Sequence, residues 1–282
     1  MTVQYQHTLR GPFEIEGVGI HTGAAARVRV EPAGTGEGVT FVLPGGERIS
    51  ALAENVTETA RATVLGTGNA SVSTVEHLLA ALFGMGIDNA SIAISGPEVP
   101  VADGSSAVFA EHIVRVGSVA QNELRRTFVP SHAQFFRDGD RALILLPAAR
   151  FRVRYVADYA APIGSQYFDA EIDPEVFRDT IAGARTFGYL HEVENLRKRG
   201  LAQGGSLDNA VVFGPDGPMQ PLRWPDEPVR HKVLDLLGDL SLLGVRPQCE
   251  VIAIKSGHKL HCTATKELRR QIVRAVPSAN VR

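Results

Sequence analysis

Residues 228–243 read PVRHKVLDLLGDLSLL. Apolar residues recur every three or four positions in this stretch, which predicts a long helix with one buried face. The apolar positions are Val229, Val233, Leu236, Leu237, Leu240 and Leu243. A strand rich in Val and Ile follows at 249–254, Ser256-Gly257 turns the chain, and a final helix is expected at about 260–276. The C-terminal half therefore ends in the order helix, strand, glycine turn, helix.

The N-terminal half contains the same order of elements. Residues 73–84 have helical periodicity, and 87–94 have the composition of a strand. Asp103-Gly104-Ser105 then predicts a tight turn, and 106–117 a second helix. The two glycine turns occupy equivalent places in the two copies. We infer that the two halves share one architecture, although their sequences are too different to prove a duplication.

The regions before these two copies are rich in strands. Residues 1–60 and 127–188 alternate short apolar stretches with Gly and Pro, which is typical of strands and turns. The polar stretch around 121–123 is interpreted as a linker. We therefore predict an α+β protein with two similar domains, residues 1–122 and 127–282.

Composition limits the classes of partner. With 282 residues, of which 44% are hydrophobic, the chain can bury a sizeable core. The net charge of −2 gives no general attraction to nucleic acid or to anionic membranes. An anionic ligand would have to be recognised by a local basic site, and neither nucleic acid nor an integral membrane contact is expected.

The cysteines and the N-terminal sequence both favour the cytoplasm. Cys249 and Cys262 are too few for the disulfide framework of a secreted protein. One bridge is possible, but two buried thiols in a reducing compartment are the simpler interpretation. The first residues lack the basic and apolar segments of a secretory signal, and no apolar run approaches the ~20 residues that span a bilayer. We expect a soluble, cytoplasmic monomer.

Glu76-His77 is the first pair of residues that could carry chemistry. Ser73-Thr74-Val75-Glu76 matches a capping box, in which the Glu side chain reaches back to the helix start, so Glu76 has a structural interpretation too. His77 lies nearly opposite the apolar stripe of its helix, which is centred near Val75. His77 therefore either is solvated or faces a cleft.

His231 and Asp235, on the long helix of the C-terminal half, give a stronger signal of a functional site. His231 and Asp235 are four residues apart on one helix, so both side chains can reach one point, as metal ligands do. Asp239 continues the same polar stripe. The alternative is an ordinary solvated face that carries a His–Asp pair.

His258 comes directly after a strand and a glycine, in Ser256-Gly257-His258. Loops that follow strands carry many functional groups, although a plain surface turn is the alternative. Lys255 beside it is either solvated or an anion contact. Two His and one Asp suit catalytic zinc and leave a position for water. Glu76 could then take a proton from that water, and His258 could donate one to a leaving amine, so the residues together predict metal-assisted hydrolysis.

Several motifs in order along the chain resemble the family of UDP-3-O-acyl-N-acetylglucosamine deacetylases, zinc amidases of lipid A synthesis. The matching stretches are Gly17 to Gly23 (GVGIHTG), Ser73 to Leu78 (STVEHL), Gly84 to Asn89 (GMGIDN), Ala184 to Gly188 (ARTFG), Gly204 to Ser206 (GGS), Arg230 to Asp239, and Lys255 to His258 (KSGH). The resemblance implies two domains, each a sheet layered with two helices, with the active site between them. It also implies an insert in each domain, the second of which, about 189–213, would build an apolar passage for the acyl chain. Leu190, Val193, Leu196 and Leu201 could line that passage.

The resemblance also implies roles for single residues. His77, His231 and Asp235 match the family's zinc ligands. Glu76 matches the general base, His258 the general acid, and Asp239 the carboxylate that orients it. The hydroxyl that helps to hold the oxyanion corresponds to Thr186. Phe187, Lys232 and Lys255 match positions near the sugar nucleotide.

The sequence departs from the family pattern near the substrate. An Asp-Phe and a His-Pro are frequent in the family, and this chain has Asp158-Tyr159 and Ala161-Pro162 instead. Tyr159 can still stack on a base, but the missing His is unexplained. A Lys near the diphosphate corresponds to Arg141, which keeps the charge and changes the geometry.

Two other functions remain open at this stage. One is a binding protein on the same fold that holds zinc or a glycolipid without catalysis, against which the presence of both Glu76 and His258 argues. The other is a zinc hydrolase that acts on a different acylated amino sugar. Iron could replace zinc in this ligand set.

Overall fold

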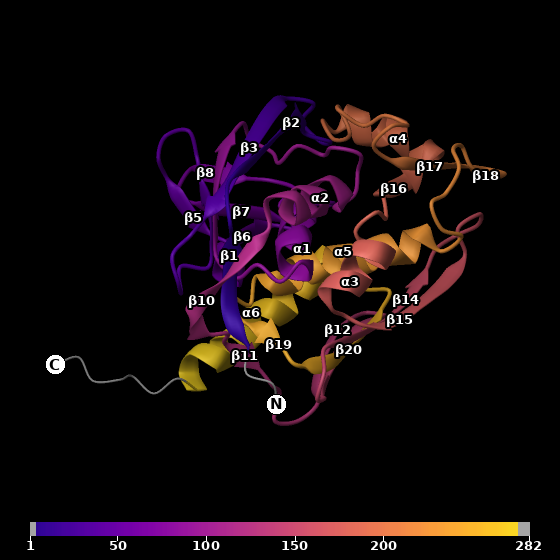
Figure 1. The fold of residues 1–282 in the computed structure, drawn as a ribbon. Coiled ribbons are helices and arrows are strands. Elements are labelled where there is room, and N and C mark those ends of the chain that lie inside the picture. The colour runs from indigo at the N-terminus through magenta and orange to yellow at the C-terminus, as the bar shows by residue number, and fades with distance from the viewer. Residues whose placement is uncertain (1–3, 276–282) are drawn as a thin grey trace.

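The computed structural model describes residues 4–275 and contains two five-stranded sheets with helices between them (Figure 1). The predicted α+β class and the two similar halves are confirmed. The first half is built from β2 (Phe13–Val18), β3 (Ala25–Pro32), β4 (Val39–Val42), β5 (Arg48–Ser50), α1 (Glu76–Gly84), β9 (Ala90–Ser95) and α2 (Ala107–Val116). The second half is built from β12 (Gln134–Asp138), β13 (Arg141–Pro147), β14 (Arg152–Asp158), β15 (Ser165–Glu171), α5 (Glu227–Ser241), β20 (Cys249–Ile254) and α6 (His258–Ala275).

The two sheets have the same topology. Their strand orders are β2-β3-β9-β4-β5 and β12-β13-β20-β14-β15, so the last strand of each half enters the middle of its sheet. It pairs antiparallel with the second strand and parallel with the third. A parallel neighbour needs a long crossover, which the preceding helix supplies. The predicted repeat of helix, strand, turn and helix is therefore part of a larger repeat that includes the whole sheet.

Burial explains why one face of each sheet carries the helices. Side chains alternate between buried and partly exposed along the central strands β9 and β20, as expected for a sheet covered on one face. The two cores exchange residues: Ala80 and Phe83 of α1 pack in the C-terminal core, and Leu242 and Cys262 pack in the N-terminal one. The two halves therefore bury each other, and neither core is complete alone.

Shorter elements complete the structure. They are β1 (Tyr5–Leu9), η1 (Ala53–Asn55), β6 (Val56–Glu58), β7 (Val64–Thr67), β8 (Ala70–Val72), β10 (Ser118–Leu124), β11 (Thr127–Phe128), α3 (Pro174–Val176), η2 (Phe177–Ile181), β16 (Phe187–Tyr189), α4 (Leu190–Lys198), β17 (Val211–Gly214), β18 (Gly217–Pro218) and β19 (Arg246–Pro247). In the insert, α4 lies beside β16 and β17 at the edge of the molecule (Figure 1).

Three expectations about the chain can be compared with these elements. The linker expected around 121–123 is wrong, because these residues lie in β10, which pairs antiparallel with β1. Their polarity follows from exposure, because an edge ribbon with few buried side chains tolerates polar residues. Cys249 and Cys262 are buried, unpaired thiols, as expected. Within residues 4–275, helices fall short of the length and apolarity that crossing a bilayer requires.

The contact between α1 and α5 brings the halves together. The two helices lie side by side between the sheets (Figure 1). Gly238 of α5 faces the backbone of Glu76, where an added Cβ would lie 2.3 Å from the Glu76 carbonyl oxygen and 2.9 Å from its carbonyl carbon. Only glycine permits this approach, since backbone atoms of a packed helix cannot move aside as the end of a side chain can.

We predict that Gly238→Ala destabilises the protein. In a helix interior alanine is about 1 kcal/mol more stabilising than glycine. Overpacking against backbone destabilises by about 1–3 kcal/mol, and we expect this clash to outweigh the gain in helix propensity. Thermal melting should show a Tm lowered by several degrees. Gly11→Ala, in a bend between β1 and β2, controls for the loss of glycine without a clash, because its added Cβ would meet nothing within 4 Å. A Gly238→Ala variant that melts at or above the parent temperature would contradict the close-contact argument.

Candidate active site

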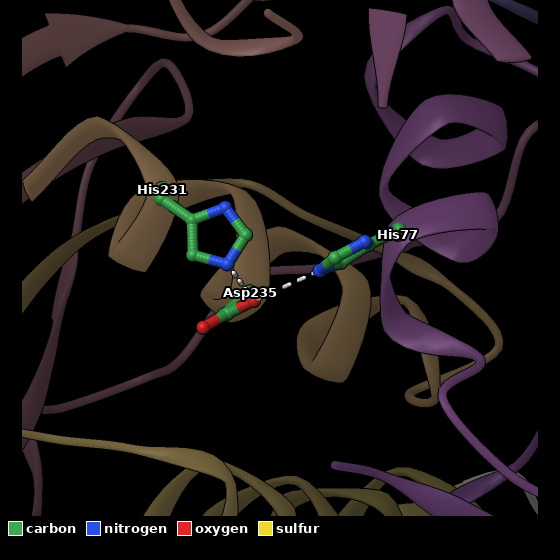
Figure 2. A group of neighbouring side chains, drawn as sticks. All are labelled: His77, His231 and Asp235. Atoms are coloured by element: carbon green, nitrogen blue, oxygen red, sulfur yellow. Dashed lines mark ion pairs between the residues drawn. The ribbon is translucent and has the colours of Figure 1, made fainter. Parts of the chain in front are cut away.

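The three predicted metal ligands lie together at the junction of the two halves. His77 projects from α1, whereas His231 and Asp235 project from α5 (Figure 2). The Asp235 Oδ1 atom is 3.4 Å from His231 Nε2 and 3.8 Å from His77 Nε2. All three side chains are buried, and their candidate ligand atoms lie within 4.8 Å of one another. The alternative of a solvated His–Asp pair on α5 is wrong.

Hydrogen bonds leave the correct atoms free to bind a metal. His231 Nδ1 lies 3.0 Å from the Ala184 carbonyl, so it carries the proton and Nε2 keeps its lone pair. Asp235 Oδ2 accepts a hydrogen bond from Lys232, whereas Oδ1 is buried without a partner in the described part of the chain. A buried carboxylate oxygen without a donor is costly unless a cation satisfies it. The donor set therefore fits a metal ion.

His77 is held differently. Its Nδ1 atom is buried without a hydrogen-bond partner within residues 4–275. The ring instead packs edge-on against the His231 ring, with centroids 5.1 Å apart. The Ser106 hydroxyl donates to the His77 carbonyl at 2.7 Å, which ties this turn of α1 to the start of α2.

The protonation states of the ligands suit metal binding. Burial lowers the pKa of His77 to about 3 and also lowers the pKa of His231, so both rings are neutral near pH 7. Burial alone would raise the pKa of Asp235, but the Lys232 ammonium holds it well below its usual range. Neutral imidazoles and an ionised carboxylate are the forms that coordinate metals.

Glu76 is buried beside this group and does not cap its helix. The α1 helix begins at Glu76, with Val75 as the preceding residue and no side-chain cap bond among the described residues, so the capping alternative is wrong. The carboxylate accepts a hydrogen bond from the Thr63 N–H at 3.0 Å. Burial raises the pKa of Glu76 to about 7 against the opposing effect of His258. A carboxylate poised near neutrality can exchange protons at physiological pH.

His258 and Asp239 form a buried hydrogen-bonded pair. His258 is the first residue of α6, and its Nδ1 lies 2.8 Å from Asp239 Oδ2. Its Nε2 faces the metal group, 3.8 Å from both Glu76 Oε1 and Asp235 Oδ2. Burial alone would lower the pKa of His258, but the nearby carboxylates, Asp239 first, raise it to about 9. His258 therefore carries a proton at neutral pH and can donate it.

A cleft of about 560 Å³ opens over these residues. Its base contains Glu76, His77, His231, Asp235 and His258. The cleft is also bordered by Arg141, the cation that departs from the family pattern, and by Thr186, which is expected to contact the oxyanion. The predicted substrate-binding residues border it as well: Asp158, Tyr159, Phe187, Lys232 and Lys255. One cavity therefore contains both the reactive groups and the residues expected to hold a substrate.

Comparison with known proteins shows similarity over almost the whole chain. The sequence model of the UDP-3-O-acyl N-acetylglycosamine deacetylase family matches residues 6–270. The chain belongs to this family. It is 46% identical to UDP-3-O-acyl-N-acetylglucosamine deacetylase of Nostoc sp. over an alignment of 267 residues. That alignment covers 91% of this chain and 95% of the relative. The enzyme of the same name from Syntrophotalea carbinolica is 45% identical over 263 residues, which cover 91% and 85% of the two chains. That from Phenylobacterium zucineum is 42% identical over 272 residues, covering 94% and 93%.

The walls of the deacetylase-family cleft are partly aromatic and partly charged. Tyr159 and Phe187 meet edge to face, with ring centroids 5.2 Å apart. The Lys255 ammonium is paired with Asp140 at 2.9 Å and with Asp158 at 2.8 Å, so neither Lys255 nor Asp158 is free in this structure. Ala161, one of the expected departures from the family pattern, is exposed and is not part of the cleft lining.

The insert at 189–213 borders the cleft through two residues. Tyr189 and Glu192 line it, and Arg61 on the opposite side pairs with Glu192 at 3.3 Å. The four apolar residues that suggested an acyl passage, Leu190, Val193, Leu196 and Leu201, lie outside the lining. Leu190 is 45% exposed. The passage therefore remains a prediction.

Two buried residues at the site were missed from the sequence. Thr63 contacts Glu76, Asp239 and His258, and His261 Nδ1 lies 2.9 Å from Asp239 Oδ2. Thr63 stands alone between Ala62 and Val64 and matches no motif. His261 lies one helical turn after His258, and that spacing alone could have suggested a shared partner.

We predict that Ala substitution of His77, His231 or Asp235 lowers the amount of bound metal, because each removes one of three protein ligands. Metal content of the purified variants is measured by elemental analysis. Asp239→Asn is the control, since Asp239 is buried on the same helix as Asp235 but points to His258. Equal metal content in all four variants and the parent would refute this ligand set.

Proposed function

We propose that this chain is a cytoplasmic, zinc-dependent deacetylase acting in lipid A biosynthesis. It hydrolyses the N-acetyl group of UDP-3-O-acyl-N-acetylglucosamine and releases acetate and the free amine. The convergence of His77, Glu76 and the α5 and α6 residues in one cleft is the observation that carries the proposal. Family membership and the names of the relatives support the choice of substrate. We further propose that it acts as a monomer.

His77 Nε2, His231 Nε2 and Asp235 Oδ1 would hold the metal. Two imidazole nitrogens and one carboxylate oxygen are a common ligand set for catalytic zinc, and metal analysis distinguishes zinc from iron. When bound, zinc supplies Lewis acidity that polarises the acetyl carbonyl and makes water a better nucleophile.

Glu76 and His258 divide the proton transfers between them. Glu76 accepts the proton of the attacking water, because its carboxylate is buried near the ligands and titrates near neutrality. His258 donates to the sugar nitrogen as the C–N bond breaks, and Asp239 orients its ring. The Thr186 hydroxyl donates to the oxyanion that develops on the acetyl carbonyl.

The rest of the substrate is held by the cleft walls. Lys232, Lys255 and Arg141 offset the charge of the diphosphate, which an almost neutral protein must do locally. Tyr159 and Phe187 offer aromatic faces to the nucleotide and sugar, and Asp158 offers a hydrogen-bond acceptor. Lys255 and Asp158 must exchange their mutual ion pair for substrate contacts. Residues 189–213 shelter the acyl chain.

The test is acetate release from UDP-3-O-acyl-N-acetylglucosamine, with and without a chelator. The parent protein should release acetate, removal of metal should abolish the activity, and zinc should restore it. The same sugar nucleotide without its acyl chain should be a much poorer substrate, because it forfeits the apolar contacts of 189–213. Equal turnover of the two substrates would refute the acyl-binding role, and no acetate from either would refute the proposed function.

The pH dependence separates the base from the acid. Activity requires ionised Glu76 and protonated His258, so kcat/KM should rise through about pH 7 and fall above about pH 9. His258→Ala should retain metal and lose the alkaline limb, whereas the acidic limb should survive.

Glu76→Gln should lower kcat by roughly 10²-fold or more, because an amide cannot accept the proton of water. A fully active Glu76→Gln enzyme would refute the base assignment. The two limbs belong to a coupled site, so they are compared between variants.

A further inference from the structure

Thr63 lies at the point where the two halves of the site meet. It precedes β7 in the N-terminal half and is fully buried. Its neighbours are Glu76 from its own half and Asp239 and His258 from the other. No part of Thr63 belongs to the cleft lining, so a direct contact with substrate does not explain its polar side chain.

The backbone of Thr63 fixes the proposed base. Its N–H donates to Glu76 Oε2 at 3.0 Å, and its carbonyl accepts from the Val75 N–H at 3.3 Å. One bond to the Glu76 side chain and one to Val75, the residue before α1, hold this segment against the start of the helix. Because Oε2 accepts this hydrogen bond, Oε1 is the Glu76 oxygen that faces the proposed acid. Glu76 Oε1 lies 3.8 Å from His258 Nε2.

The hydroxyl of Thr63 fixes the carboxylate behind the proposed acid. It donates to Asp239 Oδ1 at 2.6 Å and lies 3.2 Å from His258 Nδ1. The other oxygen, Asp239 Oδ2, accepts from His258 Nδ1 at 2.8 Å and from His261 Nδ1 at 2.9 Å. Because both oxygens are engaged, the carboxylate cannot rotate away from His258 without losing a buried hydrogen bond.

We propose that Thr63 is a positioning residue that orients the general base and the general acid relative to each other across the junction of the two halves. Its N–H orients Glu76, and its hydroxyl orients Asp239 and, through Asp239, His258. The inference rests on the proposed function for the reaction itself. The arrangement of Asp239 and His258 that it describes can be measured without substrate.

Thr63→Val tests the hydroxyl while keeping the branched shape and the backbone N–H. A hydrogen bond to a charged group that is needed to align the acid should be worth about tenfold or more in kcat. We expect that loss in Thr63→Val with unchanged KM and metal content. Thr63→Ser, which restores the donor, should recover most of the activity. A valine variant with kcat within about twofold of the parent, or equal losses in both variants, would overturn the proposal in favour of simple packing.

A second measurement keeps the inference separate from the choice of substrate. The hydrogen-bonded Nδ1 proton of His258 is followed by proton NMR in the metal-loaded proteins and assigned by its loss in His258→Ala. It should move or disappear in Thr63→Val and keep its position in Thr63→Ser. An unmoved resonance in Thr63→Val would overturn the inference even if the enzyme is active. A parent protein without deacetylase activity but with the expected NMR shift would refute only the proposed function. If Thr63→Val does not fold, Thr63→Ala replaces it in both measurements, because it places no atom against Asp239.

Discussion

The close contact of α1 with α5 is the constraint on which the site depends. His77 comes from one half of the molecule and His231 and Asp235 from the other, so their convergence requires the two helices to approach at backbone distance. Gly238 permits that approach beside Glu76, within one helical turn of Asp235. The exchanged core residues then hold the halves together: Ala80 and Phe83 pack across the junction in one direction, and Leu242 and Cys262 in the other. Hydrophobic burial therefore stabilises the geometry that the polar groups need.

Burying so many ionisable groups in one place is unfavourable unless they compensate one another. Asp239 is balanced by protonated His258 and by the donors Thr63 and His261. Asp235 is balanced on one side by Lys232, and its other oxygen faces the metal position. The same burial sets the pKa of Glu76 near 7 and that of His258 near 9. Near neutral pH one group can therefore accept a proton while the other holds one, which is how paired groups divide acid and base roles.

The sequence predicted elements whose signals are local. Helical periodicity identified α1 and α5, and the i, i+4 spacing of His231 and Asp235 placed two ligands on one face. That His77 meets them depends on contacts between residues more than 150 positions apart, which periodicity does not contain. Glu76 is held by the Thr63 N–H, 13 positions away and outside its own helix, and periodicity does not contain that contact either. Thr63 escaped notice for the same reason, since its partners Asp239 and His258 lie in the other half. Residues 121–123 are polar because they lie in an exposed edge ribbon, so polarity alone does not distinguish such a ribbon from a linker.

The repeated architecture places different side chains at the equivalent turns of the two halves. In each half, a turn after the last strand leads into the second helix. In the C-terminal half that turn ends at His258, whose ring faces the reacting groups. In the N-terminal half the equivalent turn contains Ser106, which donates to the His77 carbonyl, and Asp103, which pairs with Arg223 of the other half. One turn carries the proposed proton donor, whereas the other fixes the helix that carries a proposed metal ligand. The two equivalent turns therefore make different contacts, one within the cleft and one across the junction of the halves.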